Sequence, residues 1–150
     1  MLFRSRLAFN FSAGAGDGLM AWMGRAEHED DDYLAVGLQG GQLKVAVNLG
    51  ERLWPPQAVG SAALCCGRWH AVSLELSGTV LEVRLDGGRV LLQDVDPFER
   101  YVALNHGGVV YLGGFELHRD VAEVSGGLFS RRFVGALKDV HLYQIGRAHV

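Results

Sequence analysis

The chain has 150 residues, of which 14 are Lys or Arg and 17 are Asp or Glu, giving a formal net charge of -3. Apolar residues make up 49% and charged residues 21%, which fits one globular domain with a hydrophobic core. The acidic balance argues against a nucleic-acid partner. No apolar run reaches the ~18 residues that cross a bilayer, so we expect no membrane insertion by this segment.

Alternating apolar and polar residues dominate the first third of the chain and predict short β-strands. The predicted strands cover residues 7–12, 19–23, 34–39 and 42–49. An acidic loop at 27–32 separates the second strand from the third. Gly40-Gly41 has the composition of a two-residue hairpin turn, so it predicts direct pairing of the strands on either side.

The remainder of the chain continues the same pattern with longer interruptions. Residues 50–67 contain Pro55-Pro56 and are predicted to be mostly loop. Residues 115–132 are predicted to form a long polar loop. Further strands are predicted at 72–76, 81–85, 89–93, 101–104, 109–112 and 133–143. About ten strands without a convincing helix indicate an all-β fold, an antiparallel β-sandwich.

The two ends of the chain, residues 1–5 and 145–150, resemble the translation of a short-read sequencing adapter. We therefore expect them to be non-native scar sequence and place the domain at residues 6–144. On this reading the domain is a fragment that is truncated at both ends.

Seven short motifs follow one another in a fixed order. They read DGLMAW at 17–22, DYLAVGL at 32–38, GQLKV at 41–45, GRWHAV at 67–72, LDG at 85–87, YLGG at 111–114 and FVGALKDV at 133–140. In this order they resemble the laminin G-like domain, also called the LNS domain, of laminins, neurexins, agrin, Slit, Crumbs and Fat proteins. The resemblance covers Leu7 to Gln144.

The resemblance implies a jelly-roll β-sandwich that serves as a binding and adhesion module in a secreted or membrane-attached extracellular protein. It implies a multidomain parent with EGF-like or further laminin G-like neighbours. One position departs from the pattern: many members have a cysteine where this chain has Ala136, so their disulfide to the domain end cannot form here.

The resemblance also implies a calcium site on the rim of the sandwich. Carried over by position, its ligands are the side chains of Asp32 and Asn105 and the backbone carbonyls of Leu49 and Ala103. Calcium binds oxygen ligands of these kinds. The alternative is that Asp32 is a solvated loop acid and that Asn105 forms a turn.

The other residues that stand out in the sequence are not predicted to be catalytic or to bind a metal. Trp69 is predicted to be a core residue, and His70 a strand residue with a structural hydrogen bond. Cys65 and Cys66 are adjacent, so we expect buried free thiols or separate partners. Asn10 begins an N-glycosylation sequence, weak support for an extracellular setting. No catalytic motif is present, so we expect no enzyme activity.

The sequence thus predicts a non-enzymatic extracellular module that recognises a protein or an acidic glycan, with calcium on its rim. Two alternatives remain open. One is a lectin-like domain whose main role is carbohydrate binding. The other is a noncatalytic sandwich module attached to an enzyme such as a glycoside hydrolase.

Overall fold

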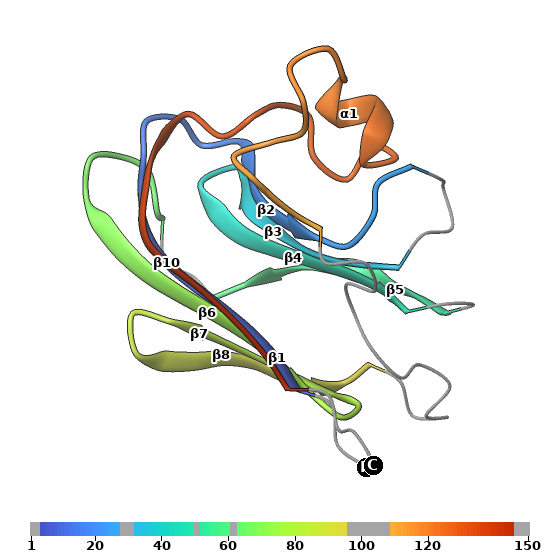
Figure 1. Ribbon diagram of the computed structural model, residues 1–150. Coiled ribbons are helices and arrows are strands. Elements are labelled where there is room, and N and C mark those ends of the chain that lie inside the picture. Colours follow the sequence, from blue (N-terminus) through green and yellow to red (C-terminus); the bar gives the residue numbers. More distant parts are fainter. Residues whose placement is uncertain (1–3, 28–31, 50–51, 61–62, 96–108, 146–150) are drawn as a thin grey trace.

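Two antiparallel five-stranded sheets form a sandwich in the computed structural model (Figure 1). The structure describes residues 4–27, 32–49, 52–60, 63–95 and 109–145, without the side chains of 52–55, 144 and 145. In spatial order, sheet A contains β10 (Gly135–Ile145), β1 (Arg4–Ala13), β6 (Trp69–Ser77), β7 (Val80–Leu85) and β8 (Gly88–Asp94). Sheet B contains β5 (Arg52–Val59), β4 (Gln42–Leu49), β3 (Tyr33–Gln39), β2 (Gly18–Met23) and β9 (Val110–Leu112). The predicted all-β antiparallel sandwich is confirmed.

The main core lies between the sheets and follows from the period of two in each strand. Along β1, every second residue from Ser5 to Ala13 is buried. Phe9 and Phe11 are almost completely buried there and meet residues such as Leu43 and Leu74 from the other strands. One apolar face per strand therefore accounts for the stacking of the two sheets.

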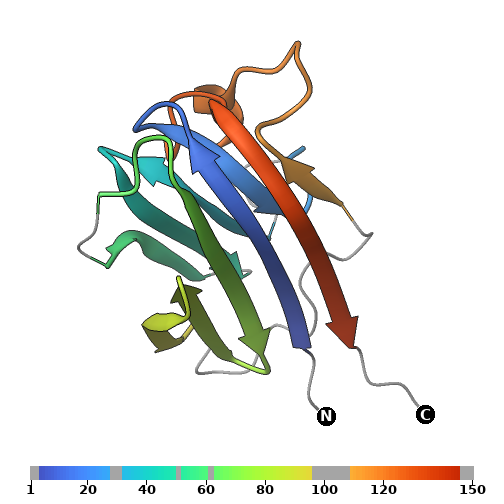
Figure 2. The ribbon, with the colours of Figure 1, turned by 90° about the vertical axis from the view of Figure 1, so that its left-hand side faces the viewer.

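Strand β1 lies between β10 and β6, so the first and last described strands are neighbours (Figure 2). Arg4 pairs with Ile145 on one side and with Ser77 on the other. Strand pairing in sheet A thus includes Arg4 and Ser5 at one end and Ile145 at the other.

Two hairpins have the short turns that the sequence predicts. Gly40 and Gly41 join β3 to β4, and both have positive φ angles, 60° and 79°. Asp86 and Gly87 join β7 to β8 in the same way, with φ angles of 52° and 84°. Two successive positive φ values match the twist of paired strands, which fixes the register on both sides.

The prediction of loop for residues 50–67 is wrong in part, because β5 occupies Arg52–Val59. Pro55 and Pro56 fall where the pairing with β4 is interrupted, between the Val45–Gln57 and Val47–Trp54 pairs. The strand lies at the edge of sheet B, and an edge strand with a bulge tolerates residues that lack an N–H group.

Trp69 is not a core residue, contrary to prediction. It pairs with Ser12 and therefore shares the outer face of sheet A, where 47% of its surface is exposed. The Nζ atom of Lys138 lies 4.0 Å from the centre of its ring. A cation over an indole face is favourable even at an exposed site, so the pair covers this end of the sheet.

The expectation for the two cysteines is also wrong. Cys65 and Cys66 are exposed, and the structure joins them to each other in a disulfide. They lie in the connection that leads into β6, where Cys65 forms an isolated bridge with Ala13. Strand pairing does not bury this connection, which is why both side chains reach the surface.

The predicted structural hydrogen bond of His70 is present. Its Nδ1 atom lies 2.8 Å from Oδ2 of Asp86, and Oδ1 of Asp86 accepts the N–H of Ala71 at 2.8 Å. Burial by itself would raise the pKa of Asp86, but the hydrogen bonds with His70 and Ala71 outweigh it, so the pKa of this carboxyl is lowered. The ionised carboxylate therefore ties the β7–β8 hairpin to β6.

Only one short helix interrupts the strands in the part of the chain that the structure describes, α1 at Val121–Val124. No helix among these residues is both long and apolar enough to cross a membrane.

We expect Asp86→Asn to lower the free energy of unfolding near neutral pH, since Asn tolerates the positive φ but cannot hold the negative charge. A lowered pKa stabilises the fold above the ordinary carboxyl value of about 3.9, and this contribution is lost as the pH falls through the lowered pKa. The difference between wild type and variant should therefore shrink in acid. Urea unfolding at about pH 7 and about pH 3 measures it, and a difference independent of pH would contradict this role.

Candidate functional site

The outer face of sheet B is apolar, unlike that of sheet A. Residues that point away from the main core form a second buried cluster on this face with residues from 115–129. Its buried members are Leu19, Trp22, Ala26, Tyr33, Ala35, Ala46, Phe115, Val121 and Phe129. We call residues 113–132, which lie over this face and include α1, the covering segment (Figure 1). The prediction of a polar loop at 115–132 is therefore wrong in part.

Aromatic rings connect the covering segment to the sheet. Trp22 on β2 and Tyr33 on β3 stack with their ring centres 4.3 Å apart. Phe115 meets Trp22 edge to face at 5.3 Å and meets Tyr111 in the same manner at 5.1 Å. Burial raises the pKa of Tyr33, so its hydroxyl stays protonated at neutral pH.

Two arginines of the covering segment bind backbone carbonyl oxygens. Arg132 donates to the carbonyl of Phe115, and Arg119 donates to the carbonyl of Ala26. Arg119 also pairs with Glu116 at 3.0 Å. These bonds satisfy backbone carbonyls that no strand partner would reach.

A lysine from the sheet performs a similar role beneath the covering segment. Lys44 on β4 donates to the carbonyl of Leu128, and its Nζ atom lies 5.2 Å from the centre of the Phe129 ring. Burial lowers the pKa of Lys44. Ser125 is buried, and its Oγ atom bonds both the N–H and the carbonyl of Phe129 at 3.1 Å. Ser125 therefore holds the backbone of Phe129, and Lys44 contacts its ring.

A pocket of about 410 Å³ lies between sheet B and the covering segment. Its lining includes Trp22, Tyr33 and Asn48 from the sheet, and Glu123 and Leu128 from the covering segment. Asn48 is 7% exposed, and its Oδ1 atom has no hydrogen-bond partner within the described residues. An oxygen acceptor is thus held in a largely apolar setting at the end of β4.

Two of the four predicted metal ligands are the chain neighbours of residues that line this pocket. Tyr33 pairs with Asn48, so Asp32, just before β3, and Leu49, the last residue of β4, come next along the two strands. The backbone of Gly24 passes close to Asp32: a Cβ atom on Gly24 would stand 2.3 Å from the Asp32 carbonyl oxygen, so a larger residue would clash there. We call Asp32 and Leu49 the rim pair.

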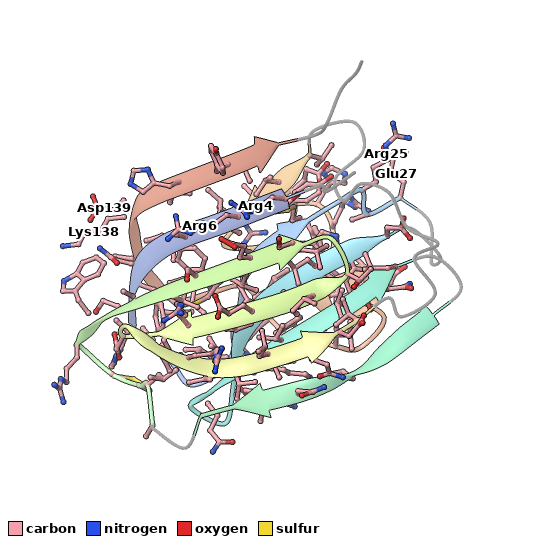
Figure 3. All side chains as sticks on the ribbon, turned by 90° about the horizontal axis from the view of Figure 1, so that it is seen from below. Arg4, Arg6, Arg25, Glu27, Lys138 and Asp139 are labelled. Carbon is pink, nitrogen blue, oxygen red and sulfur yellow. A yellow bond between two sulfur atoms is a disulfide. The ribbon has the colours of Figure 1, made fainter. Side chains whose placement is uncertain are left out.

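The other two predicted ligands, Ala103 and Asn105, lie outside the described residues, as do residues 28–31 of the acidic loop. Glu27 at the near end of that loop is described, and Figure 3 shows it beside Arg25 at the edge of the molecule. The described residues contain no group of three or more His, Cys, Asp or Glu side chains that could hold a metal. A site at the rim pair would therefore depend on backbone and amide oxygens as well as Asp32.

Sequence reasoning missed Asn48 and the covering segment. A signal for the second was available: β2 is buried at all six positions, and its sequence GLMAWM is apolar throughout. A strand without polar alternation is one that is covered on both faces. No comparable signal singles out Asn48, because its burial depends on residues that follow it by more than 70 positions.

Comparisons with known proteins give a consistent result. The sequence model for the laminin G domain matches residues 11–145. The protein eyes shut homolog of Danio rerio is 54% identical over 143 residues, which cover 95% of this chain and 5% of that protein. The basement membrane proteoglycan of Caenorhabditis elegans is 29% identical over 140 residues, 91% of this chain and 4% of that protein. The chain therefore spans a small part of these relatives.

Among solved structures, domains LG4-5 of the mouse laminin alpha1 chain superpose with a TM-score of 0.74. The match covers 93% of this chain and 35% of that one, at 21% sequence identity. At this level of identity, the likeness shows a shared fold.

We expect Gly37→Ala to destabilise the protein, since Gly37 lies on the outer face of β3 beneath Phe129. A Cβ atom there would stand 2.4 Å from the Gly18 carbonyl oxygen and 2.6 Å from Cε1 of Phe129. Overpacking of this kind costs about 1–3 kcal/mol.

The matched control is Gly88→Ala, where the nearest contact of a new Cβ atom is 3.7 Å away. This change should stay within about 0.5 kcal/mol of wild type. Guanidinium unfolding compares the two variants, and equal stability would show that Phe129 does not rest on Gly37.

Proposed function

This chain belongs to the laminin G domain family, and from that premise we propose that it binds an extracellular protein or acidic glycan at a calcium-bearing rim. Its extracellular location agrees with relatives that are named as basement membrane proteins. The role is that of a binding module without catalytic activity of its own. The observation that supports the proposal is the register of β3 and β4, in which Tyr33 pairs with Asn48 and the rim pair follows directly on these two residues.

The donor chemistry of the rim pair fits calcium. A carboxylate and a backbone carbonyl are hard oxygen ligands, which calcium prefers over nitrogen or sulfur. Asp32 and Leu49 would supply two ligands, and Ala103 and Asn105 would supply the other protein ligands. The acidic stretch at 27–32 contains five carboxylates, which raise the local concentration of cations.

A bound calcium ion would supply positive charge at an otherwise acidic edge of the domain. Carboxylate or sulfate groups of a ligand could then complete its coordination shell. This would reconcile an acidic chain with an acidic ligand, since the net charge of -3 would otherwise oppose binding.

The lectin-like alternative receives less support from the pocket beside the rim. Sugar recognition commonly uses an exposed aromatic face, but Trp22 and Tyr33 stack on each other and are only 3% and 6% exposed. Their faces are already covered by protein. These two rings are therefore better placed to support the rim pair than to bind a sugar.

Isothermal titration calorimetry with calcium tests the proposal on the whole chain. We expect wild type to bind one ion and Asp32→Asn to bind about tenfold more weakly or worse, because a ligand loses its charge at nearly constant size. Calcium at about 100 times its Kd should also stabilise the wild-type fold by about 2.7 kcal/mol.

The matched control is Asp139→Asn, which makes the same chemical change on sheet A and preserves the backbone, since Asn also tolerates the φ angle of 55° there. It should bind calcium as wild type does. No heat of binding for the wild type, or equal losses in both variants, would remove the calcium site from the proposal.

A further inference from the structure

The outer face of sheet A carries the one Asn-X-Ser/Thr sequence in the chain, Asn10-Phe11-Ser12. Because β1 alternates, the half-buried Asn10 and Ser12 point outward, whereas Phe11 between them is completely buried in the core. In an extracellular protein such a sequence is an acceptor for N-linked sugar, which requires a surface position.

The amide of Asn10 has one hydrogen to spare. Nδ2 donates to Oδ2 of Asp139 at 2.9 Å, and an Asn amide has two N–H groups. Asp139 lies where β10 bulges opposite β1, between the Asn10–Lys138 and Ala8–His141 pairs. Linking a sugar to Nδ2 would replace one hydrogen and leave the other for Asp139, so the modification and the native contact are compatible.

The surface next to Asn10 is hollowed. A groove of about 390 Å³ crosses β10, β1, β6 and β7 on the outer face of sheet A. Its lining includes the small side chains of Ala8 and Ala71 and the longer ones of Arg6, Arg84 and His141. Figure 3, which views the molecule from this side, shows Arg6 along β1 and Asp139 on the neighbouring β10.

We propose that Asn10 is N-glycosylated and that the first sugar residue lies in this groove. The reaction joins Nδ2 to the anomeric carbon of a polyprenyl-pyrophosphate-linked oligosaccharide. The new N–C bond replaces the C–O bond to the pyrophosphate, which leaves with the polyprenyl carrier, and Nδ2 gives up one proton.

The groove suits a pyranose ring chemically. The methyl groups of Ala8 and Ala71 offer apolar contacts for one ring face, and Arg6, Arg84 and His141 offer hydrogen-bond partners for hydroxyl and acetamido groups. A sugar seated there covers the middle of sheet A. A protein partner would then bind elsewhere, for example at the rim pair or on the covering segment.

This inference rests on the extracellular location and not on calcium. Asn10 and the rim pair belong to different sheets, so the failure of one proposal leaves the other standing.

Expression of the whole chain in secreting animal cells tests the modification. Enzymatic removal of N-glycans in H₂¹⁸O converts a glycosylated Asn10 to Asp that carries ¹⁸O, and peptide mass spectrometry locates it. We expect the label at Asn10 in most of the wild-type protein and in Ser12→Thr, and none in Ser12→Ala. Ser12→Ala is the sharpest control, because it removes the acceptor sequence and retains Asn10 and its bond to Asp139.

Sugar transfer occurs on the chain as it enters the secretory pathway, so the cell-retained fraction is analysed together with the secreted one. A variant that folds poorly is therefore still informative. An unmodified Asn10 in the wild-type chain overturns the proposal, whatever the result for Ser12→Thr.

The position of the sugar is tested by NMR on protein trimmed to a single N-acetylglucosamine and labelled at alanine methyl groups. We expect nuclear Overhauser contacts between the sugar and the methyl groups of Ala8 and Ala71. A modified protein that lacks these contacts would overturn the seating in the groove.

Discussion

Sheet B has apolar side chains on both faces, and this constraint organises the rest of the molecule. One face packs against sheet A, as in any two-layer sandwich. The other would expose Trp22, Tyr33 and their neighbours to water, so the chain must return over it. The covering segment does this with Phe115 and Phe129, and its backbone is tied down by arginine, lysine and serine bonds.

The candidate site is a consequence of that arrangement. The rim pair lies at the end of β3 and β4, immediately beyond Tyr33 and Asn48, which the covering segment buries. Side chains that are packed on both sides hold the strand ends in place, and a metal ligand or ligand-binding rim gains from such rigidity. We therefore interpret the side chains that line the pocket as support for the rim pair, and not as a separate binding site.

Among the residues that the structure describes, no segment covers the outer face of sheet A in this way. Polar and small residues such as Ser12, Ala8 and Arg6 alternate with the core residues of β1, and the face stays open between longer side chains. The two outer faces of the sandwich therefore differ in how they are covered. Protein covers the face of sheet B, and the face of sheet A offers the acceptor asparagine, a natural place for covalent sugar.

The sequence by itself determined the strands and hairpins, because period-two alternation and paired turn residues such as Gly40-Gly41 act between near neighbours. It also determined the family, and the two-residue turn at Gly40-Gly41 fixed the register of β3 and β4, in which Tyr33 pairs with Asn48. Only the tertiary structure decided which face Trp69 occupies, that β5 forms across two prolines, and that residues 113–132 cover sheet B. Each of these depends on packing between residues far apart in the chain, and a local pattern contains no information about the partner that it will meet.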